Sequence, residues 1–194
     1  RGAGNLLGGE QSGHIEAIGF ELYTQMLERA VREMKGESGV EATEIQLNLG
    51  LNIRIPADYM KEENQRLRMY KRIAGVETES QLTDVRNELV DRYGEPPNAV
   101  RNLLAYAALK LQAMRVGATA IERKRELMNI KFSQNASIDL AKLARFVASQ
   151  QKSQFTPDGT LKFSIKISST DGILQTLRDL LEELEAQEAP APTT

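Results

Sequence analysis

The first thirteen residues constrain this chain more than any other stretch, because five of them are glycine. The run reads RGAGNLLGGEQSG. Glycine adopts backbone angles that other residues avoid, but it loses the most conformational entropy when it is ordered. The run therefore cannot be a regular helix or strand. We expect a loop in which the backbone turns sharply or approaches another group closely.

Three known chemical devices do not fit the spacing of this loop. A dinucleotide fingerprint needs G-x-G-x-x-G, but Leu7 stands where the third glycine belongs. A Walker A loop ends in Gly-Lys followed by Ser or Thr, and the first lysine of the chain is Lys35. A nucleophile elbow needs G-x-S-x-G, and Ser12 comes one position too late. Taken by itself, the loop is typical of a surface segment.

Composition limits the classes of function. The chain has 194 residues, 27% of them charged and 41% apolar, which is typical of a globular protein with a real core. A net charge of −2 gives no general attraction to nucleic acid or acidic membranes. The absence of cysteine excludes disulfides and thiolate metal sites and fits a cytoplasmic location, which we expect. Because the chain begins on Arg1 without an initiator Met, we also expect it to be part of a longer protein.

The rest of the chain alternates between helical and strand-like periodicity. Residues 44–55 alternate polar and apolar along their whole length, which predicts one half-buried strand with a bulge at Gly50. Thr78 and Gln81 form the pattern of a capping box. The predicted helices are 15–34, 61–74, 78–93, 96–115, 139–149 and a last one after residue 170 with an acidic end. The fifth is capped by Ser137 or Asp139 and the last by Thr170 or Asp171. The further predicted strands are 120–125, 127–133, 155–156 and 160–167, the last two joined by an Asp-Gly turn.

These elements predict an α+β fold with a small mixed or antiparallel sheet packed against about five to six helices. A glycine-rich loop and one helix would precede it. The longest helix, 96–115, is expected at the centre of the core. Helix 61–74 is expected to bury Leu67, Tyr70 and Ile73 and to expose its basic residues. In helix 139–149, Leu140, Leu143, Ala144 and Val147 are expected to point inward.

The string from Arg1 to Phe20 resembles the end of the second motor lobe in bacterial transcription-repair coupling factors, the Mfd family. The RecG branch-migration helicases carry a related segment. In both families this segment belongs to a motif that links ATP hydrolysis to movement along duplex DNA. The resemblance implies that residues 1–38 are the end of a translocase motor lobe. It also implies that Arg1 and Gln11 occupy polar positions of the translocation motif.

The resemblance continues to about residue 115 and then weakens to a pattern of elements. The stretches that carry it are IPADY at 55–59, RL at 66–67, YKRIA at 70–74 and ELVDRYG at 88–94, with Pro97. They look like the C-terminal domain of the coupling factors, which RecG lacks; only Tyr93 departs, where we would expect Phe. The resemblance implies that residues 39–187 are this domain, α+β and without catalytic activity, and we expect residues 188–194 to be a disordered tail.

The resemblance also implies what the parent protein does. It would be an ATP-dependent DNA translocase that displaces stalled RNA polymerase and recruits excision repair, with ATP and Mg held by its motor. This region would contain no catalytic residue, cofactor or metal, and would act as an autoinhibitory interaction module. Its partner would be the N-terminal UvrB-like module of the same parent chain, with UvrA, RNA polymerase and duplex DNA reached indirectly. No membrane contact is expected.

Two charged surfaces are the candidates for the interdomain interface. One is the positive face of helix 61–74, and the other is the acidic end of the last helix. Their residues are Lys61, Arg66, Arg68, Lys71, Arg72, Glu182, Glu183 and Glu185. Such basic clusters more often meet carboxylates of a neighbouring surface than phosphates. Two alternatives stay open: an enzyme domain that holds a phosphate or nucleotide in the glycine-rich loop, and a module that binds DNA directly.

Overall fold

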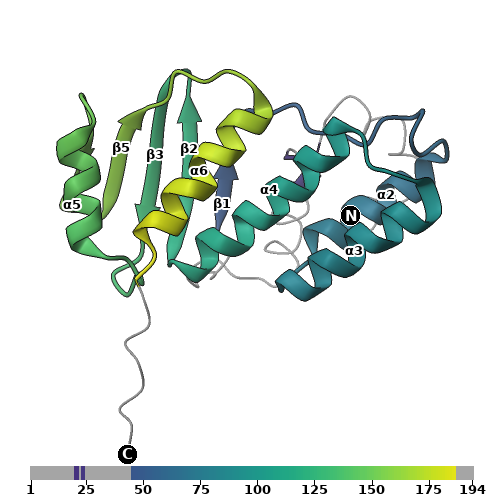
Figure 1. Ribbon diagram of the computed structural model, residues 1–194, viewed down its shortest axis with the longest axis horizontal. Coiled ribbons are helices and arrows are strands. Elements are labelled where there is room, and N and C mark those ends of the chain that lie inside the picture. Colours follow the sequence, from purple (N-terminus) through teal and green to yellow (C-terminus); the bar gives the residue numbers. More distant parts are fainter. Residues whose placement is uncertain (1–19, 22, 25–44, 187–194) are drawn as a thin grey trace, which may run out of the picture. The chain divides into compact units, whose positions relative to one another are not determined.

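The computed structural model describes residues 20, 21, 23, 24 and 45–186 (Figure 1). The chain divides into two compact units. The first contains residues up to Thr43 and Gly50–Leu111, and the second contains Glu44–Leu49 and Gln112–Thr194. The expected boundary after residue 38, the loop with Arg1 and Gln11, and the tail 188–194 lie outside the described residues. No helix in the described part of the chain has the length and apolar character that crossing a membrane requires.

The described part of the first unit contains three long helices. Their ends lie close to the capping, glycine and proline residues that predicted them. They are α2 (Glu63–Ala74), α3 (Glu79–Tyr93) and α4 (Asn98–Arg115), of which residues up to Leu111 belong to this unit. Half of the capping box forms as expected, since the Gln81 amide donates to Thr78 Oγ1 at 3.2 Å, whereas Gln81 Oε1 accepts from the amide of Glu77, one residue before the N-cap, at 2.8 Å. Helix α3 ends at Gly94, whose φ of 80° a side chain would rarely allow.

Four aromatic side chains make the centre of the first unit. The Phe20 ring lies 5.5 Å from the Tyr70 ring and 5.9 Å, edge to face, from the Tyr106 ring. Tyr23 lies 6.0 Å from Tyr70. Such pairs add stabilisation beyond the apolar area that they bury. The helical residues around Phe20, which the sequence assigned to a separate motor segment, therefore form part of the core of this unit.

The prediction of one strand over residues 44–55 is wrong in its length. Strand β1 covers only Gln46–Asn48, because only these residues pair with a neighbouring strand. The alternation of buried and exposed side chains nevertheless continues to Ile55. At Gly50 the backbone takes a φ of 66°, and the chain passes from the second unit into the first. Gly50 therefore marks the end of the strand and not a bulge within it.

Beyond Gly50, two side chains and the backbone of Phe20 supply the hydrogen bonds that a neighbouring strand would otherwise make. Glu21 accepts hydrogen bonds from the amides of Gly50 at 3.2 Å and Leu51 at 2.9 Å. The Ile55 amide donates to the Tyr70 hydroxyl at 2.6 Å, and the Phe20 amide donates to the Ile53 carbonyl at 2.8 Å. Buried backbone groups need such partners when no ladder supplies them. The segment is thus extended and half-buried, as its pattern predicts, without being part of the sheet.

The second unit contains a five-stranded mixed sheet in the order β1-β2-β3-β5-β4 (Figure 1). Its other strands are β2 (Ala118–Lys124), β3 (Leu127–Phe132), β4 (Gln154–Phe155) and β5 (Thr160–Ser164). Strand β1 pairs with β2 in parallel, and the other pairs are antiparallel. A row of buried residues crosses four strands in register: Leu47, Ile121, Ile130 and Leu161. One face of the sheet is therefore a continuous apolar surface.

Helix α6 (Thr170–Leu184) crosses one face of this sheet (Figure 1). Its apolar face is buried: Ile173, Leu174, Leu177, Leu180, Leu181 and Leu184. Ser169 stands at the N-cap position in place of Thr170 or Asp171, and its side chain makes no capping hydrogen bond. The predicted α+β class and the expected helices of this unit are confirmed.

Helix α5 (Leu140–Ser149) corrects one expectation about the core. Asp139 is the N-cap, and its Oδ1 accepts from the amides of Ala141 at 2.8 Å and Lys142 at 3.1 Å. Phe146 packs edge to face on Phe163 of β5 at 5.4 Å, and Leu143 is buried. Leu140 is 68% exposed, and Ala144 is also exposed. Periodicity identifies the apolar face of a helix. It does not show which part of that face is covered by a neighbouring helix or strand.

Candidate functional site

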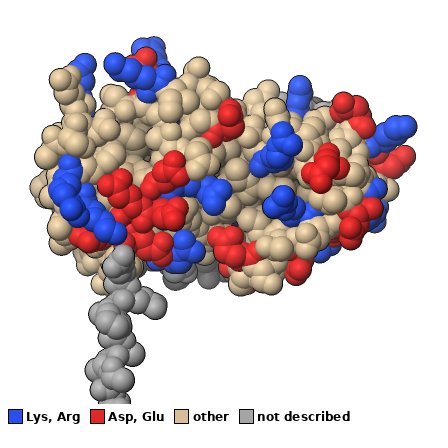
Figure 2. Space-filling model, viewed as in Figure 1, with Lys and Arg blue, Asp and Glu red and all other residues tan. Residues whose placement is uncertain are grey.

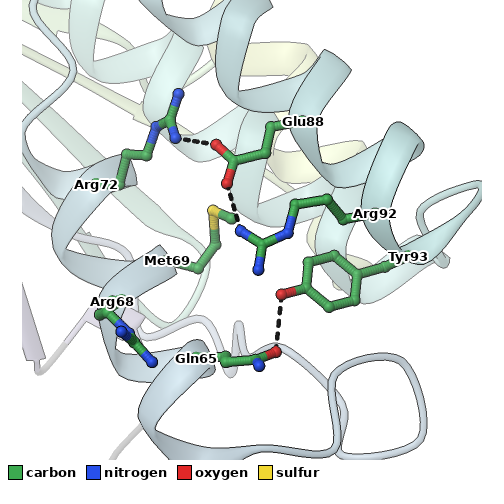
Figure 3. A pocket seen from close by; sticks show the side chains of 7 residues that line it. All are labelled: Gln65, Arg68, Met69, Arg72, Glu88, Arg92 and Tyr93. Atoms are coloured by element: carbon green, nitrogen blue, oxygen red, sulfur yellow. Dashed lines mark hydrogen bonds and ion pairs between the residues drawn. The ribbon is translucent and has the colours of Figure 1, made fainter.

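A concave site in the described part of the first unit lies between helices α2 and α3. We call it the α2–α3 hollow, and it has a volume of about 260 Å³. Figure 3 shows that α2 and α3 contribute side chains from its two sides. The residues that line it are Gln65, Arg68, Met69, Arg72, Glu88, Arg92 and Tyr93. Three guanidinium groups and one carboxylate give the hollow an excess of positive charge.

Glu88 holds two of these arginines together. It is paired with Arg72 across the helices and with Arg92 one turn later on α3, at 2.8 Å in the second pair (Figure 3). The guanidinium of Arg92 also lies 5.2 Å from the centre of the Tyr93 ring. The arginine side chains are about half exposed, at 49% and 53%, so solvent screens these pairs. Their main consequence is to fix where the guanidinium groups lie.

Arg68 is the remaining cation of the hollow. Its Nε donates to the Asn64 carbonyl of its own helix at 3.3 Å. Among the described residues it has no carboxylate partner within ion-pair distance. Arg68 therefore brings a charge to the hollow that the described part of the chain does not neutralise by a direct pair.

Tyr93 lines the hollow, and Tyr59 packs against Tyr93. The Tyr93 hydroxyl donates to Gln65 Oε1 at 2.9 Å, which joins the two helices (Figure 3). The ring of Tyr59 lies 5.8 Å from that of Tyr93, and its single O–H donor is shared between the carbonyls of Gly94, at 2.9 Å, and Leu89, at 3.2 Å. Burial raises the pKa of Tyr59, and the nearby Glu95 and Tyr93 raise it further. The phenol therefore stays a neutral donor that ties the end of α3 in place.

One of the basic residues expected on the exposed face of α2, Arg66, is buried. Arg66 is only 6% exposed, and it donates to the carbonyls of Met60 at 2.7 Å and Lys61 at 2.8 Å. The aliphatic part of arginine covers apolar surface easily, while backbone carbonyls satisfy its head group. Lys61, Arg68, Lys71 and Arg72 are exposed as expected. Arg66 is therefore a structural residue, and Leu67, expected inside, is only half-buried.

The second candidate surface is the acidic end of α6, formed by Glu182, Glu183 and Glu185. Acidic side chains gather over the C-terminal half of this helix (Figure 2). Glu182 and Glu183 are exposed, whereas Glu185 pairs with Arg115 through two hydrogen bonds of 2.7 and 3.2 Å. Its backbone carbonyl also accepts from Lys142 Nζ at 3.2 Å. Glu185 therefore joins α6 to the rest of its own unit. Within the described part of the chain, the charges of this surface that lack an ion pair are those of Glu182 and Glu183.

Sequence reasoning missed Gln65, Glu88, Arg92 and Tyr93 as members of a site. Only the four-residue spacing of Glu88 and Arg92 hinted at a charged pair on one helix face. Arg1 and Gln11, predicted for a translocation motif, lie outside the described residues. Within those residues no group of three or more His, Asp or Glu side chains could hold a metal ion. The chemistry that the hollow offers is recognition of an anion by guanidinium groups.

Comparison with known proteins identifies the chain. The family model of the TRCF domain matches residues 49–143. The transcription-repair-coupling factor of Staphylococcus haemolyticus (strain JCSC1435) is 41% identical over 139 residues, which is 71% of this chain and 12% of the relative. That of Staphylococcus aureus (strain USA300) is 38% identical over 152 residues, 77% of this chain and 13% of the relative. The chain thus spans about an eighth of the length of these relatives.

A solved structure agrees with this match. The crystal structure of the C-terminal domain of transcription-repair coupling factor has a TM-score of 0.61 to this chain at 21% sequence identity. The likeness covers 72% of this chain and 91% of that one, so the α+β fold is that of the C-terminal domain. The chain belongs to the transcription-repair coupling factor family and carries its C-terminal region.

Proposed function

We propose that this chain is a non-catalytic regulatory region of a DNA translocase that acts in transcription-coupled repair. In the parent protein, a motor that uses ATP and Mg would move along duplex DNA, displace stalled RNA polymerase and recruit excision repair. This region would dock on the N-terminal UvrB-like module and hold the parent in a restrained state. Docking would cover the surface that otherwise binds UvrA. The name of the relatives, which joins transcription to repair, supports this role.

The observation that carries the proposal is the α2–α3 hollow, whose charged arginine side chains are about half exposed. A restraint that must release should use a polar interface of moderate strength, because exposed ion pairs contribute only about 0–1 kcal/mol each. Several such pairs together can bias a two-state equilibrium by a few kcal/mol, which a partner or substrate can overcome. Arg68, Arg72 and Arg92 offer charges of this kind.

Deletion of residues 45–186 from the full-length protein tests the role. We expect DNA binding, ATP hydrolysis and UvrA binding all to rise, because the restraint is removed. Wild-type levels of all three activities after deletion would contradict a restraining role. Direct DNA binding by this region would instead appear as salt-dependent loss of DNA affinity on deletion.

A further inference from the structure

We propose that one end of the sheet in the second unit binds the phosphodiester backbone of duplex DNA. The surface consists of four exposed basic side chains, and we call it the basic rim: Lys124, Arg125, Lys152 and Lys166. The inference rests on the proposed function for the identity of the ligand, since the parent would move along duplex DNA. A weak contact of this kind would add to DNA binding once the restraint is released.

The turn between β2 and β3 carries the first two residues of the basic rim. Lys124 pairs with Leu127 at the end of the ladder, so Arg125 and Glu126 form a two-residue hairpin loop. The Glu126 carbonyl accepts a hydrogen bond of 2.7 Å from the Ile165 amide, which fixes the loop against the end of β5. The hairpin loop is therefore a held part of this end of the sheet.

Strand register brings the other two rim residues to the same end. Leu127, next to the loop, pairs with Ser164 at the end of β5, and Lys166 follows two residues later. Strand β4 is antiparallel to β5 and begins at Gln154, opposite Lys162, so the chain that carries Lys152 enters the sheet from the end where β5 leaves it. Figure 1 shows the β2–β3 turn and the end of β5 together at the upper end of the sheet.

The described residues include two non-glycine residues with positive φ, and both belong to the basic rim. The φ angle is 59° at Arg125 and 63° at Lys152. Glycine adopts such left-handed conformations easily, whereas other residues lose free energy in them. Two-residue hairpin loops usually carry Asn, Asp or Gly where Arg125 stands. A side chain at a position that disfavours it indicates a role for that side chain, and here both side chains are cations.

Neighbouring carboxylates neutralise little of the charge of the rim. Apart from Lys124, the rim residues have no ion pair within the described part of the chain. The Lys124 side chain is 76% exposed, and its Nζ lies 4.0 Å from the Glu122 carboxylate, at the limit of an ion pair. Glu126 is exposed in the hairpin loop and offsets one charge. The rim therefore presents a net positive charge to solvent.

The extent of the rim suits a row of phosphates. The rim reaches from β2 past β3 and β5 to β4, which is three strand spacings or about 14 Å. Phosphates follow one another about every 3.4 Å along the axis of a DNA strand, so the rim spans about four of them. A bilayer fits less well, because the large apolar residues exposed beside the rim are Leu127 and Ile167, each only 40% exposed.

The test measures binding of the 194-residue chain to a fluorescent DNA duplex of about 20 base pairs by anisotropy. We expect a Kd near 0.1 mM at about 50 mM salt, and a slope of log K against log salt of about −3. A glutamate-rich peptide and vesicles that contain phosphatidylserine are titrated in parallel, and neither should saturate the chain at the same concentrations. Absence of duplex binding, or equal or tighter binding of the peptide or the vesicles, would overturn the proposal.

Glycine variants separate charge from structure. The double variant Arg125→Gly and Lys152→Gly removes two cations and suits the positive φ at both sites, so its urea midpoint should not fall. Its Kd for the duplex should rise about tenfold or more, and the salt slope should shrink by about two. The control Arg86→Ala changes an exposed arginine of α3 and should alter neither value. Unchanged duplex binding by the double variant, or a lower urea midpoint, would contradict the proposal.

The two proposals fail in different ways. If the chain binds the duplex through the rim but deletion of residues 45–186 releases no activity, the rim is a DNA contact and the restraint is wrong. If deletion releases all three activities but the chain does not bind the duplex, the restraint stands and the rim has no role in DNA binding.

Discussion

The backbone amide of Leu51 donates a 2.9 Å hydrogen bond to the carboxylate of Glu21, which lies thirty residues earlier in the chain. Glu21 is only 7% exposed, and its other oxygen accepts from the Gly50 amide at 3.2 Å. This carboxylate stands where a neighbouring strand would otherwise be. It fixes the segment that carries the chain away from β1 and couples it to the helical turn around Phe20.

Glu21→Ala should destabilise the first unit by about 1–3 kcal/mol, because a buried amide loses its acceptor. Glu21→Gln keeps one acceptor oxygen and should lose less. Hydrogen exchange read at the Gly50 and Leu51 amides, with urea unfolding beside it, measures both effects. The matched control is Glu95→Ala, which removes an exposed carboxylate from the same unit. Equal behaviour of the two alanine variants would show that the Glu21 bonds contribute nothing.

Tyr70→Phe should destabilise the same unit by about 1–3 kcal/mol. The change keeps the ring contacts with Phe20 and Tyr23 but removes the hydroxyl that accepts from the Ile55 amide at 2.6 Å. Urea unfolding followed by circular dichroism measures the loss. Unchanged stability would mean that the Ile55 amide finds another partner without cost.

Arg66 and Arg68 should respond differently to the same substitution, although they are two residues apart. Arg66→Ala should lose about 2–4 kcal/mol, because charge-assisted bonds to one buried and one partly buried carbonyl disappear. Arg68→Ala should change the free energy of unfolding by no more than about 0.5 kcal/mol. Thermal or urea unfolding of the two variants decides this. An Arg66→Ala variant as stable as the wild type would show that the hydrogen bonds of Arg66 do not stabilise the fold.

Much of the fold follows from local sequence. The capping box at Thr78 and Gln81, the proline pair before α4 and the Asp139 cap all mark helix ends that the structure contains. These signals act within a few residues, so sequence alone carries them. Alternation also identified Leu47 through Ile55 as half-buried, although only three residues are in β1. Whether an extended segment is a strand depends on its partner, which local pattern does not contain.

The α2–α3 hollow could not be predicted from the sequence, because it too depends on contacts between distant parts of the chain. The basic residues of α2 were visible in the sequence, but Glu88, Arg92 and Tyr93 join them only because α3 packs beside α2. Helical periodicity placed Arg66 on the exposed face as well. It is buried because the turn before α2 brings two carbonyls to its guanidinium, a feature of the folded backbone and not of the helix.

The free energy of unfolding should depend on pH partly through the carboxylate of Asp139, which caps helix α5. Hydrogen bonding from the Lys142 amide, with a second bond from Ala141, lowers the pKa of Asp139 below its ordinary value of 3.8, while desolvation opposes this in part. A carboxyl whose pKa is lower in the folded state stabilises it above the unfolded pKa. That contribution is lost as pH falls through the folded pKa.

Asp139→Asn should therefore be less stable than the wild type at pH 6, and the difference should shrink as the pH falls below about 4. Urea unfolding at a series of pH values measures it, with Asp91→Asn as an exposed control. A difference that stays constant down to about pH 2.5 would show that the ionised cap contributes nothing.

Association of this chain, added in trans, with the N-terminal half of the parent coupling factor tests the central claim most directly. Isothermal titration calorimetry should show saturable binding that weakens with added salt, because exposed charges supply the interface. Arg68→Glu should weaken it about tenfold, while Arg86→Glu should leave it unchanged. Absence of binding, or equal effects of the two reversals, would contradict the account that this region restrains its parent through the α2–α3 hollow.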